Sequence, residues 1–166
     1  VTQLTTDMIA IKVVDKLGYR KVALIAHSLA ALGLALFGVL HFIIPIIPSI
    51  IISTVIFSVG GGLLEVIISP IVESVPGEAK EQAMSLLHSF YCWGHVAVIL
   101  LSTLFFTLCG IENWKILTFL WAAFPLITAG YFLLVPIAKP VEEGKGMSLK
   151  ALLSSRVIWV FIIIMT

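Results

Sequence analysis

Charged residues are scarce in this sequence: they make up 11% of its 166 positions, against about 25% in a typical soluble domain. A chain with so few charges cannot present the hydrated surface of a soluble globular protein. Only two cysteines are present, and both lie in apolar runs, which argues against a disulfide framework. A net charge of +1 gives no indication of nucleic-acid binding. Apolar residues make up 60% of the chain and the mean hydropathy is +1.16, so we expect an integral membrane protein.

Long apolar runs divide the chain into helical spans. The runs 22–42, 46–73, 83–108 and 116–137 are each long enough to cross a hydrocarbon core, which needs about 20 residues of helix. Residues 1–14 resemble the last turns of a helix that begins upstream, and residues 157–166 the start of another. We therefore expect both ends of the chain to continue. The predicted fold is an all-α, polytopic membrane helical bundle.

Basic residues fall almost entirely on one side of these alternating spans. The loops 15–21, 74–82 and 138–156 share a side, and together with Lys12 they hold nine of the ten basic residues; only Lys115 is opposite. Loops rich in Lys and Arg stay in the cytoplasm. We therefore expect these three loops to be cytoplasmic in a multi-pass protein of the inner (plasma) membrane. Within the third loop, residues 148–155 predict a short amphipathic helix at the membrane surface.

One carboxylate lies inside the span 46–73. Ile46 to Leu64 contains no ionisable residue, and apolar residues resume after Glu65. Glu65 lies eight residues from Glu73, which is about 12 Å along a helix. A charged side chain at that depth costs on the order of 3 kcal/mol and is tolerated when it faces a bundle interior or an aqueous path. We interpret Glu65 as a proton-coupling or substrate-binding group; the alternative is a neutral structural glutamate bonded to a neighbouring helix.

Further polar residues are aligned on the same span and on the next one. Ser58 and Ser69 share a face with Glu65, together with Gly61 or Gly62. On the span 83–108 a polar line has spacings of three and four residues: Ser85, His88, Cys92 and His95, with Tyr91 and Trp93 nearby. This line predicts a substrate-lining face or interhelical hydrogen bonds. A metal site is disfavoured because the line extends over about 15 Å, and we expect no cofactor.

Small residues occur where they favour close helix packing. On the span 22–42 they share one face: Ser28, Ala31, Ala35 and Gly38. The span 46–73 contains Gly60, Gly61 and Gly62 in succession, which lets a neighbouring backbone approach closely in a membrane. At the inner rim, the shared side of the loops suggests that Arg20 or Lys21 pairs with Glu73 or Glu78.

The stretch Asp15-Lys16-Leu17-Gly18-Tyr19-Arg20-Lys21 resembles the loop between helices 2 and 3 of the major facilitator superfamily, whose pattern is G-x-x-x-D-R-x-G-R-R/K. Asp15, Gly18 and Arg20 match this pattern, and Lys16 replaces an arginine. The chain departs from it at Ile11 and Tyr19. The resemblance implies an inner gate loop that latches two halves of a transporter, formed by Asp15, Lys16, Gly18, Arg20 and Lys21.

The stretch from Gly60 to Pro70 is similar to helix 4 of the fucose permease branch, G-x-G-x-L-E-x-x-x-N-P, with Ser69 in place of the asparagine. The segment 87–94 resembles the polar helix 5 of that branch. These resemblances divide the chain into a partial N-terminal half with helices 2 to 6 (1–137), a central cytoplasmic loop (138–156) and the start of helix 7 (157–166). They imply that Glu65 is a protonatable carboxylate and that the C-terminal half of the same chain completes the site.

The expected function is secondary active transport by alternating access, with proton-coupled symport of a sugar or similar small polar solute across the lipid bilayer. The substrate path would be lined by Ser58, Ser69, His88, Tyr91, Cys92 and His95. Two alternatives are a non-transporting sensor or receptor on the same fold and a small oligomeric channel. An enzyme that uses His88, Cys92 and His95 is disfavoured, because the polar loops offer no water-facing catalytic cluster.

Overall fold

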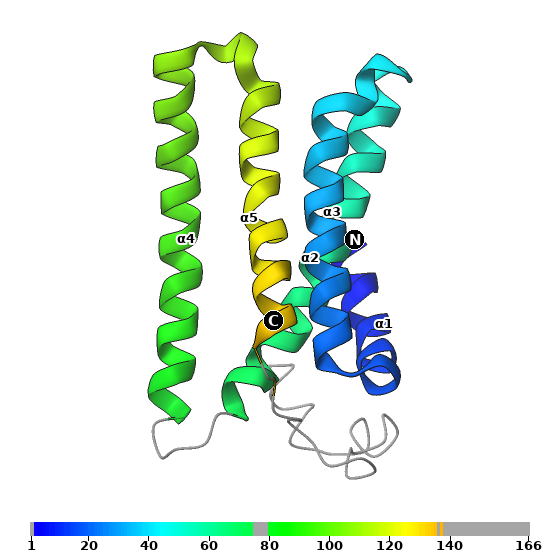
Figure 1. The fold of residues 1–166 in the computed structure, drawn as a ribbon, viewed down its shortest axis with the longest axis vertical. Helices are drawn as coiled ribbons and strands as arrows, with labels where there is room; N and C mark the ends of the chain where they lie inside the picture. The colour runs from blue at the N-terminus through cyan, green and yellow to red at the C-terminus, as the bar shows by residue number, and fades with distance from the viewer. Residues whose placement is uncertain (1, 75–79, 136, 138–166) are drawn as a thin grey trace, which may run out of the picture.

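The computed structural model describes residues 2–74, 80–135 and 137, and every regular element within these ranges is helical (Figure 1). The elements follow in this order: α1 (Thr2–Leu17), α2 (Tyr19–Val39), η1 (Leu40–Phe42), α3 (Ile46–Glu73), α4 (Lys80–Cys109), η2 (Ile111–Asn113) and α5 (Trp114–Leu134). The elements η1 and η2 are short 3-10 helices. The segments 138–156 and 157–166, the amphipathic helix expected at 148–155 and most of the loop 74–82 lie outside the described residues.

Four helical stretches are long and apolar enough to cross a membrane: Tyr19–Phe42, Ile46–Glu73, Lys80–Cys109 and Ile111–Leu134. They correspond to the four predicted spans, so the expected all-α membrane bundle is confirmed for the described residues. The last span ends earlier than predicted, because Val135 has an extended backbone with φ -82° and ψ 127°. Val135 precedes Pro136, and the ring of a proline disfavours the helical conformation for the residue before it.

The corner between α1 and α2 consists of one residue. We expected a loop over 15–21, but residues 15–17 continue α1 and residues 19–21 begin α2. Gly18 has a φ of 79°, which glycine adopts without the steric cost that a side chain brings. Its N–H donates to the carbonyl of Val14 at 2.8 Å, and its own carbonyl accepts from Val22 at 3.2 Å, so hydrogen bonding continues through the corner. The predicted gate residues therefore lie at the ends of two helices.

Two glycines allow α2 and α3 to pack with their backbones in contact. A Cβ atom added at Gly33 would lie 2.5 Å from the backbone nitrogen of Phe57, and one added at Gly60 would lie 2.6 Å from the backbone nitrogen of Ala30. Neither position can therefore carry a side chain at this separation. The buried core extends this contact toward α1 through a set of small and branched residues: Ala10, Val14, Val22, Ala23, Ala26, Leu63 and Ile67.

The small residues of α2 that were predicted to favour close packing are not buried to the same extent. Of the four small residues that share the predicted face, Ala31 and Gly38 are buried, Ala35 is half-buried and Ser28 is exposed. Gly38 packs against α5, whereas Gly33 packs against α3. Small residues occur on more than one side of α2 because this helix contacts both neighbours, so residue size alone does not identify the partner of each side.

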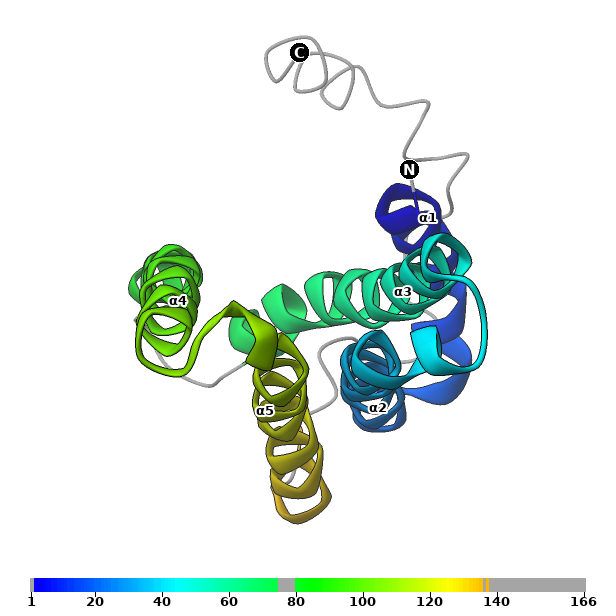
Figure 2. The same cartoon turned by 90° about the horizontal axis from the view of Figure 1, so that it is seen from above.

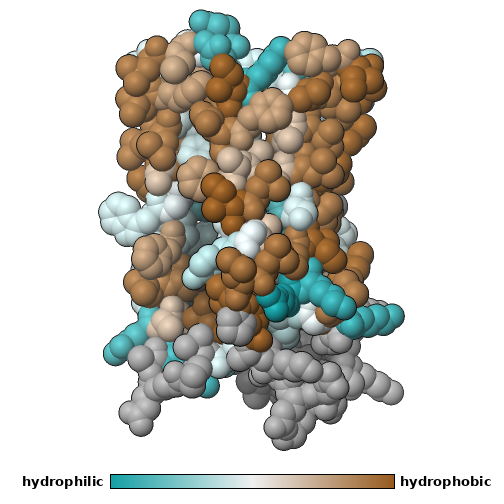
Figure 3. All heavy atoms as spheres, in the orientation of Figure 1, coloured by the Kyte–Doolittle hydropathy of each residue, from teal (hydrophilic) through white to brown (hydrophobic). Residues whose placement is uncertain are grey.

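α4 stands at the edge of the bundle. α2 packs against α3 and α5, and α1 packs against α3, whereas α4 has no buried residue among those described (Figure 2). Trp121 Nε1 of α5 donates a hydrogen bond to Ser102 Oγ of α4 at 3.1 Å. Hydrophobic residues cover much of the visible face of the helices, and hydrophilic residues gather toward the two ends (Figure 3). This distribution suits helices that are surrounded by lipid.

We predict that Gly60→Ala destabilises the full-length protein and that Gly61→Ala does not. A Cβ atom at position 60 meets the backbone of α2, and overpacking of this kind costs about 1–3 kcal/mol. A Cβ atom at position 61 meets nothing within 4 Å, so Gly61→Ala controls for the helix propensity of alanine. The measurement is the unfolding temperature in detergent; equal temperatures for the two variants would contradict the prediction.

Candidate functional site

α3 has one packed face and one open face. Gly60, Leu63 and Ile67 are buried, and the latter two belong to the core formed with α1 and α2. Glu65 follows Leu63 by two residues, which places it about 200° further around the helix. Its side chain is exposed in the bundle of described helices. Glu65 is thus an ionisable residue within a membrane span, on the side of α3 that does not form the core.

The open face of α3 also carries the smaller residues predicted to accompany Glu65. Ser58 and Ser69 are both half-buried. Gly61 has open space around it, whereas Gly62 is buried, so Gly61 is the glycine that belongs to this face. The structure therefore brings the three predicted polar residues of α3 to one side of the helix.

Several polar residues of α4 hydrogen-bond within their own helix. His95 Nδ1 lies 2.9 Å from the carbonyl oxygen of Tyr91, and the two rings pack edge to face with centroids 4.5 Å apart. Farther along the helix, Thr103 and Thr107 donate to the carbonyls four residues before them at 2.8 Å. His88, Tyr91, Cys92 and His95 are all exposed. Their exposure leaves these side chains available to a neighbour or a solute.

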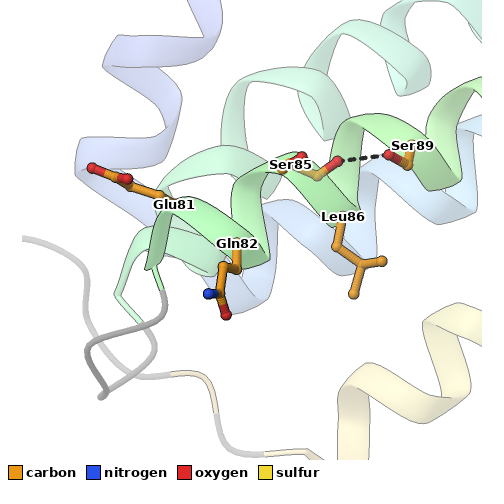
Figure 4. Close-up of a pocket in the computed structure, with 5 residues that line it drawn as sticks. All are labelled: Glu81, Gln82, Ser85, Leu86 and Ser89. Carbon is orange, nitrogen blue, oxygen red and sulfur yellow. Dashed lines mark hydrogen bonds between the residues drawn. The ribbon is translucent and has the colours of Figure 1, made fainter.

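An open recess of about 390 Å³ lies at the N-terminal end of α4 (Figure 4). All of its lining residues belong to this one helix: Glu81, Gln82, Ser85, Leu86 and Ser89. Ser89 Oγ donates to the carbonyl oxygen of Ser85 at 2.9 Å, the interaction drawn in Figure 4. Glu81 and Gln82 were expected in the loop 74–82, whereas α4 already begins at Lys80. The polar line of α4 thus extends further toward the N-terminal end of the helix than predicted.

Arg20 joins the start of α2 to the C-terminal end of α5. Its Nε donates to the carbonyl oxygen of Phe132 at 3.1 Å, and its Nη2 donates to the carbonyl oxygen of Leu133. The last carbonyls of a helix have no partner within the helix, and a cation near them also interacts favourably with the helix dipole. Arg20 therefore acts as a C-terminal cap for α5.

The suggested pairing of Arg20 with Glu73 is wrong, because the guanidinium group is directed to α5. Glu78, the other proposed partner, lies outside the described residues. The sequence carried no signal for the observed contact, since a backbone carbonyl is present at every position.

Nearby, buried His27 has its Nδ1 2.8 Å from the carbonyl oxygen of Ala23, and the centroid of its ring lies 5.2 Å from that of the Phe132 ring. Arg20 and His27 thus join the same two helices.

Among the described residues, no group of three or more histidine, cysteine or acidic side chains could hold a metal ion. Cys92 and Cys109 are both free thiols on α4. They are separated by seventeen residues of helix, about 25 Å, and so cannot form a disulfide with each other. What the described helices offer is an acid on α3 and aligned polar groups on α4, an arrangement suited to binding a polar solute.

We predict that Arg20→Ala lowers the stability of the full-length protein by about 1 kcal/mol, because the last carbonyls of α5 lose a charged donor. Lys21→Ala is the matched control: it removes the same charge from the next residue, whose exposed side chain makes no such contact. Thermal unfolding in detergent measures both changes. A loss of equal size in the two variants would mean that charge, and not capping of α5, accounts for the effect.

The comparisons with known proteins identify the family. The family model described as Major Facilitator Superfamily matches residues 1–166. Neither the search of curated proteins nor the search of solved structures finds a match to this chain. The family match covers the full sequence and agrees with the four apolar spans. The chain therefore belongs to the major facilitator superfamily, a family of secondary transporters rather than enzymes.

Proposed function

We propose that this chain forms part of a proton-coupled symporter for a sugar or similar small polar solute, with Glu65 as the coupling residue. The observation that carries the proposal is the position of Glu65, an acid inside a membrane span on the face of α3 that does not form the core. An intramembrane carboxylate that faces a bundle interior or an aqueous cavity is typical of proton pathways and substrate sites. The resemblance of residues 60–70 to the fucose permease branch also supports this choice.

The substrate path follows α3 and α4, which are in contact with one another. On α3 the path includes Ser58 and Ser69, on either side of Glu65. On α4 it includes a line of exposed polar residues: His88, Tyr91, Cys92 and His95. Hydroxyl and imidazole groups both donate and accept hydrogen bonds, as recognition of a polyhydroxylated solute requires. The C-terminal half of the same chain supplies the opposite wall, since transporters of this kind bind their substrate between two repeats near the bilayer midplane.

Coupling rests on the charge of Glu65. In the outward-open state a proton from outside binds the carboxylate, and the neutral carboxyl group can then donate a hydrogen bond to the solute. Removal of the charge lowers the cost of closing the site around Glu65, because a buried ion is far more costly than a buried neutral acid. The site then opens inward, where both the solute and the proton leave. The charged empty carrier returns by a path that keeps Glu65 hydrated or paired.

The orientation and the inner gate follow from the basic residues. Lys16, Arg20, Lys21 and Lys80 lie near the end of the bundle where α1 meets α2 and α4 begins, and Lys115 lies at the start of α5, near the opposite end. The positive-inside rule supports a cytoplasmic position for the first end, in an inner (plasma) membrane. The gate residues Asp15, Lys16, Gly18, Arg20 and Lys21 form the helix corner on that side. Through Arg20 this corner is joined to α5, the last described span.

We predict that Glu65→Gln abolishes proton-driven accumulation while preserving exchange of solute. Glutamine keeps the size and polarity of the side chain but cannot carry a proton, so the solute can cross without coupling. The full-length protein in proteoliposomes would be tested with radiolabelled fucose and other hexoses, under an imposed pH gradient and in counterflow. Glu73→Gln is the control, because this acid lies at the end of the same helix and outside the proposed path.

Normal accumulation by Glu65→Gln would rule out the coupling role. Solute binding without flux in the wild-type protein would favour the sensor or receptor alternative. Passive conduction that needs no gradient and shows no counterflow would favour the channel alternative.

A further inference from the structure

A side-chain hydrogen bond joins α4 to α5 inside the membrane. The indole Nε1–H of Trp121 donates to Ser102 Oγ at 3.1 Å, and both side chains are half-buried. Trp121 lies ten residues after Ile111 and thirteen before Leu134, so it stands near the middle of its span. Tryptophan usually collects at the membrane interface, where water can satisfy its N–H group. A tryptophan at the middle of a span must instead find its acceptor within the protein.

The indole is also held from its own helix. The Phe124 ring lies about one turn further along α5, with its centroid 5.6 Å from that of Trp121. This contact restricts the rotation of the indole and keeps its N–H directed at α4. The serine hydroxyl on α4 is a suitable partner, because the indole N–H is a donor only and the hydroxyl oxygen has lone pairs that accept.

Apolar packing restrains the rotation of α4 only weakly. No residue of α4 is buried in the described bundle, whereas α2 and α3 meet closely at their glycines. Contacts with lipid are much the same on every side of an apolar helix, so they do not select one rotation of it. A hydrogen bond does select a rotation, because it requires the donor and the acceptor at a defined distance and angle.

The hydrogen bond lies on nearly the same face of α4 as the proposed solute path. His95 and His88 precede Ser102 by seven and fourteen residues, which places them about 20° and 40° from it around the helix. Cys92 lies about 80° from Ser102, in the same direction. A rotation of α4 that breaks the bond would therefore turn all of these groups together.

We propose that Trp121 is a positioning residue for the solute path: its hydrogen bond to Ser102 fixes the rotation of α4 and so directs the polar groups of that helix toward the solute. This role rests on the proposed function, since it concerns the same path. Trp121 acts through the orientation of α4 and does not touch the solute. Glu65 lies on α3, whose rotation is set by its contact with α2, so proton coupling does not depend on Trp121.

The test measures the orientation of α4 with Cys92 as the reporter. The full-length protein in proteoliposomes is treated with a membrane-impermeant maleimide, and mass spectrometry of the Cys92 peptide gives the labelling rate in the absence of solute. Trp121→Phe keeps an aromatic ring but removes the N–H donor. It should slow the labelling by roughly threefold, the effect of one interhelical hydrogen bond in a membrane. Ser102→Ala removes the acceptor and should slow it equally, and the double variant should slow it no further.

Two further variants test whether the hydroxyl of Ser102 is the group that matters. Ser102→Thr keeps a hydroxyl and should retain the wild-type labelling rate. Thr103→Val is the matched control: it removes a neighbouring hydroxyl that donates to its own helix, at the carbonyl of Ile99, and should leave the rate unchanged. In counterflow with hexoses, Trp121→Phe should raise the KM by a similar factor while the maximal rate and proton-driven accumulation are retained.

Equal Cys92 labelling in the wild-type protein, Trp121→Phe and Ser102→Ala would overturn the proposal. A lower unfolding temperature with unchanged labelling would also overturn it, because the bond would then have a structural role only. Slower labelling in a protein that transports no hexose would support the orientation of α4 by Trp121 and count against the proposed function. Should Trp121→Phe fail to fold, Ser102→Ala decides the same question.

Discussion

The backbone contact between α2 and α3 at Gly33 and Gly60 determines how the rest of the bundle is arranged. At this separation the two helices leave no room for a Cβ atom at either glycine, so the contact fixes the rotation of α3 about its own axis. Leu63 and Ile67 therefore point into the core that α3 forms with α1 and α2. Glu65 is turned to the opposite side by helical geometry alone. The direction in which Glu65 points is thus set by the packing of α2 against α3 at Gly33 and Gly60.

α4 is stabilised in the membrane mainly by hydrogen bonds within the helix, and less by packing against other helices. It makes few contacts with its neighbours in the described part of the chain, and it relies on hydrogen bonds from its side chains to its own backbone. A side-chain hydrogen bond from Trp121 of α5 to Ser102 joins the two helices. Ser89, His95, Thr103 and Thr107 are therefore hydrogen-bonded without being enclosed. A surface of this kind can serve a solute that arrives and leaves, because binding does not require breaking contacts between helices.

The sequence predicted those features that depend on the character of a whole segment. The spans, the all-α fold and the common side of Ser58, Glu65 and Ser69 follow from hydropathy and helical period, and the structure contains them. Features that depend on a single neighbour could not be predicted in this way. The partner of Arg20 is a carbonyl group, which leaves no trace in the sequence, and Gly18 alone replaces the loop expected over 15–21. The role of each polar residue in transport remains a prediction, because it depends on the solute and on the C-terminal half that is proposed to complete the site.

The hydrogen bonds within α4 have a consequence for biosynthesis. A polar side chain that is satisfied by the carbonyl one turn earlier adds less to the cost of transferring the helix from water to lipid. Ser89, His95, Thr103 and Thr107 are all satisfied in this manner before any tertiary contact forms. α4 can therefore leave the insertion machinery and reside in the bilayer as an independent helix. The glycines at the contact between α2 and α3 contribute to stability only once the two helices have packed against each other. The stability of each of these helices therefore depends on the presence of the other.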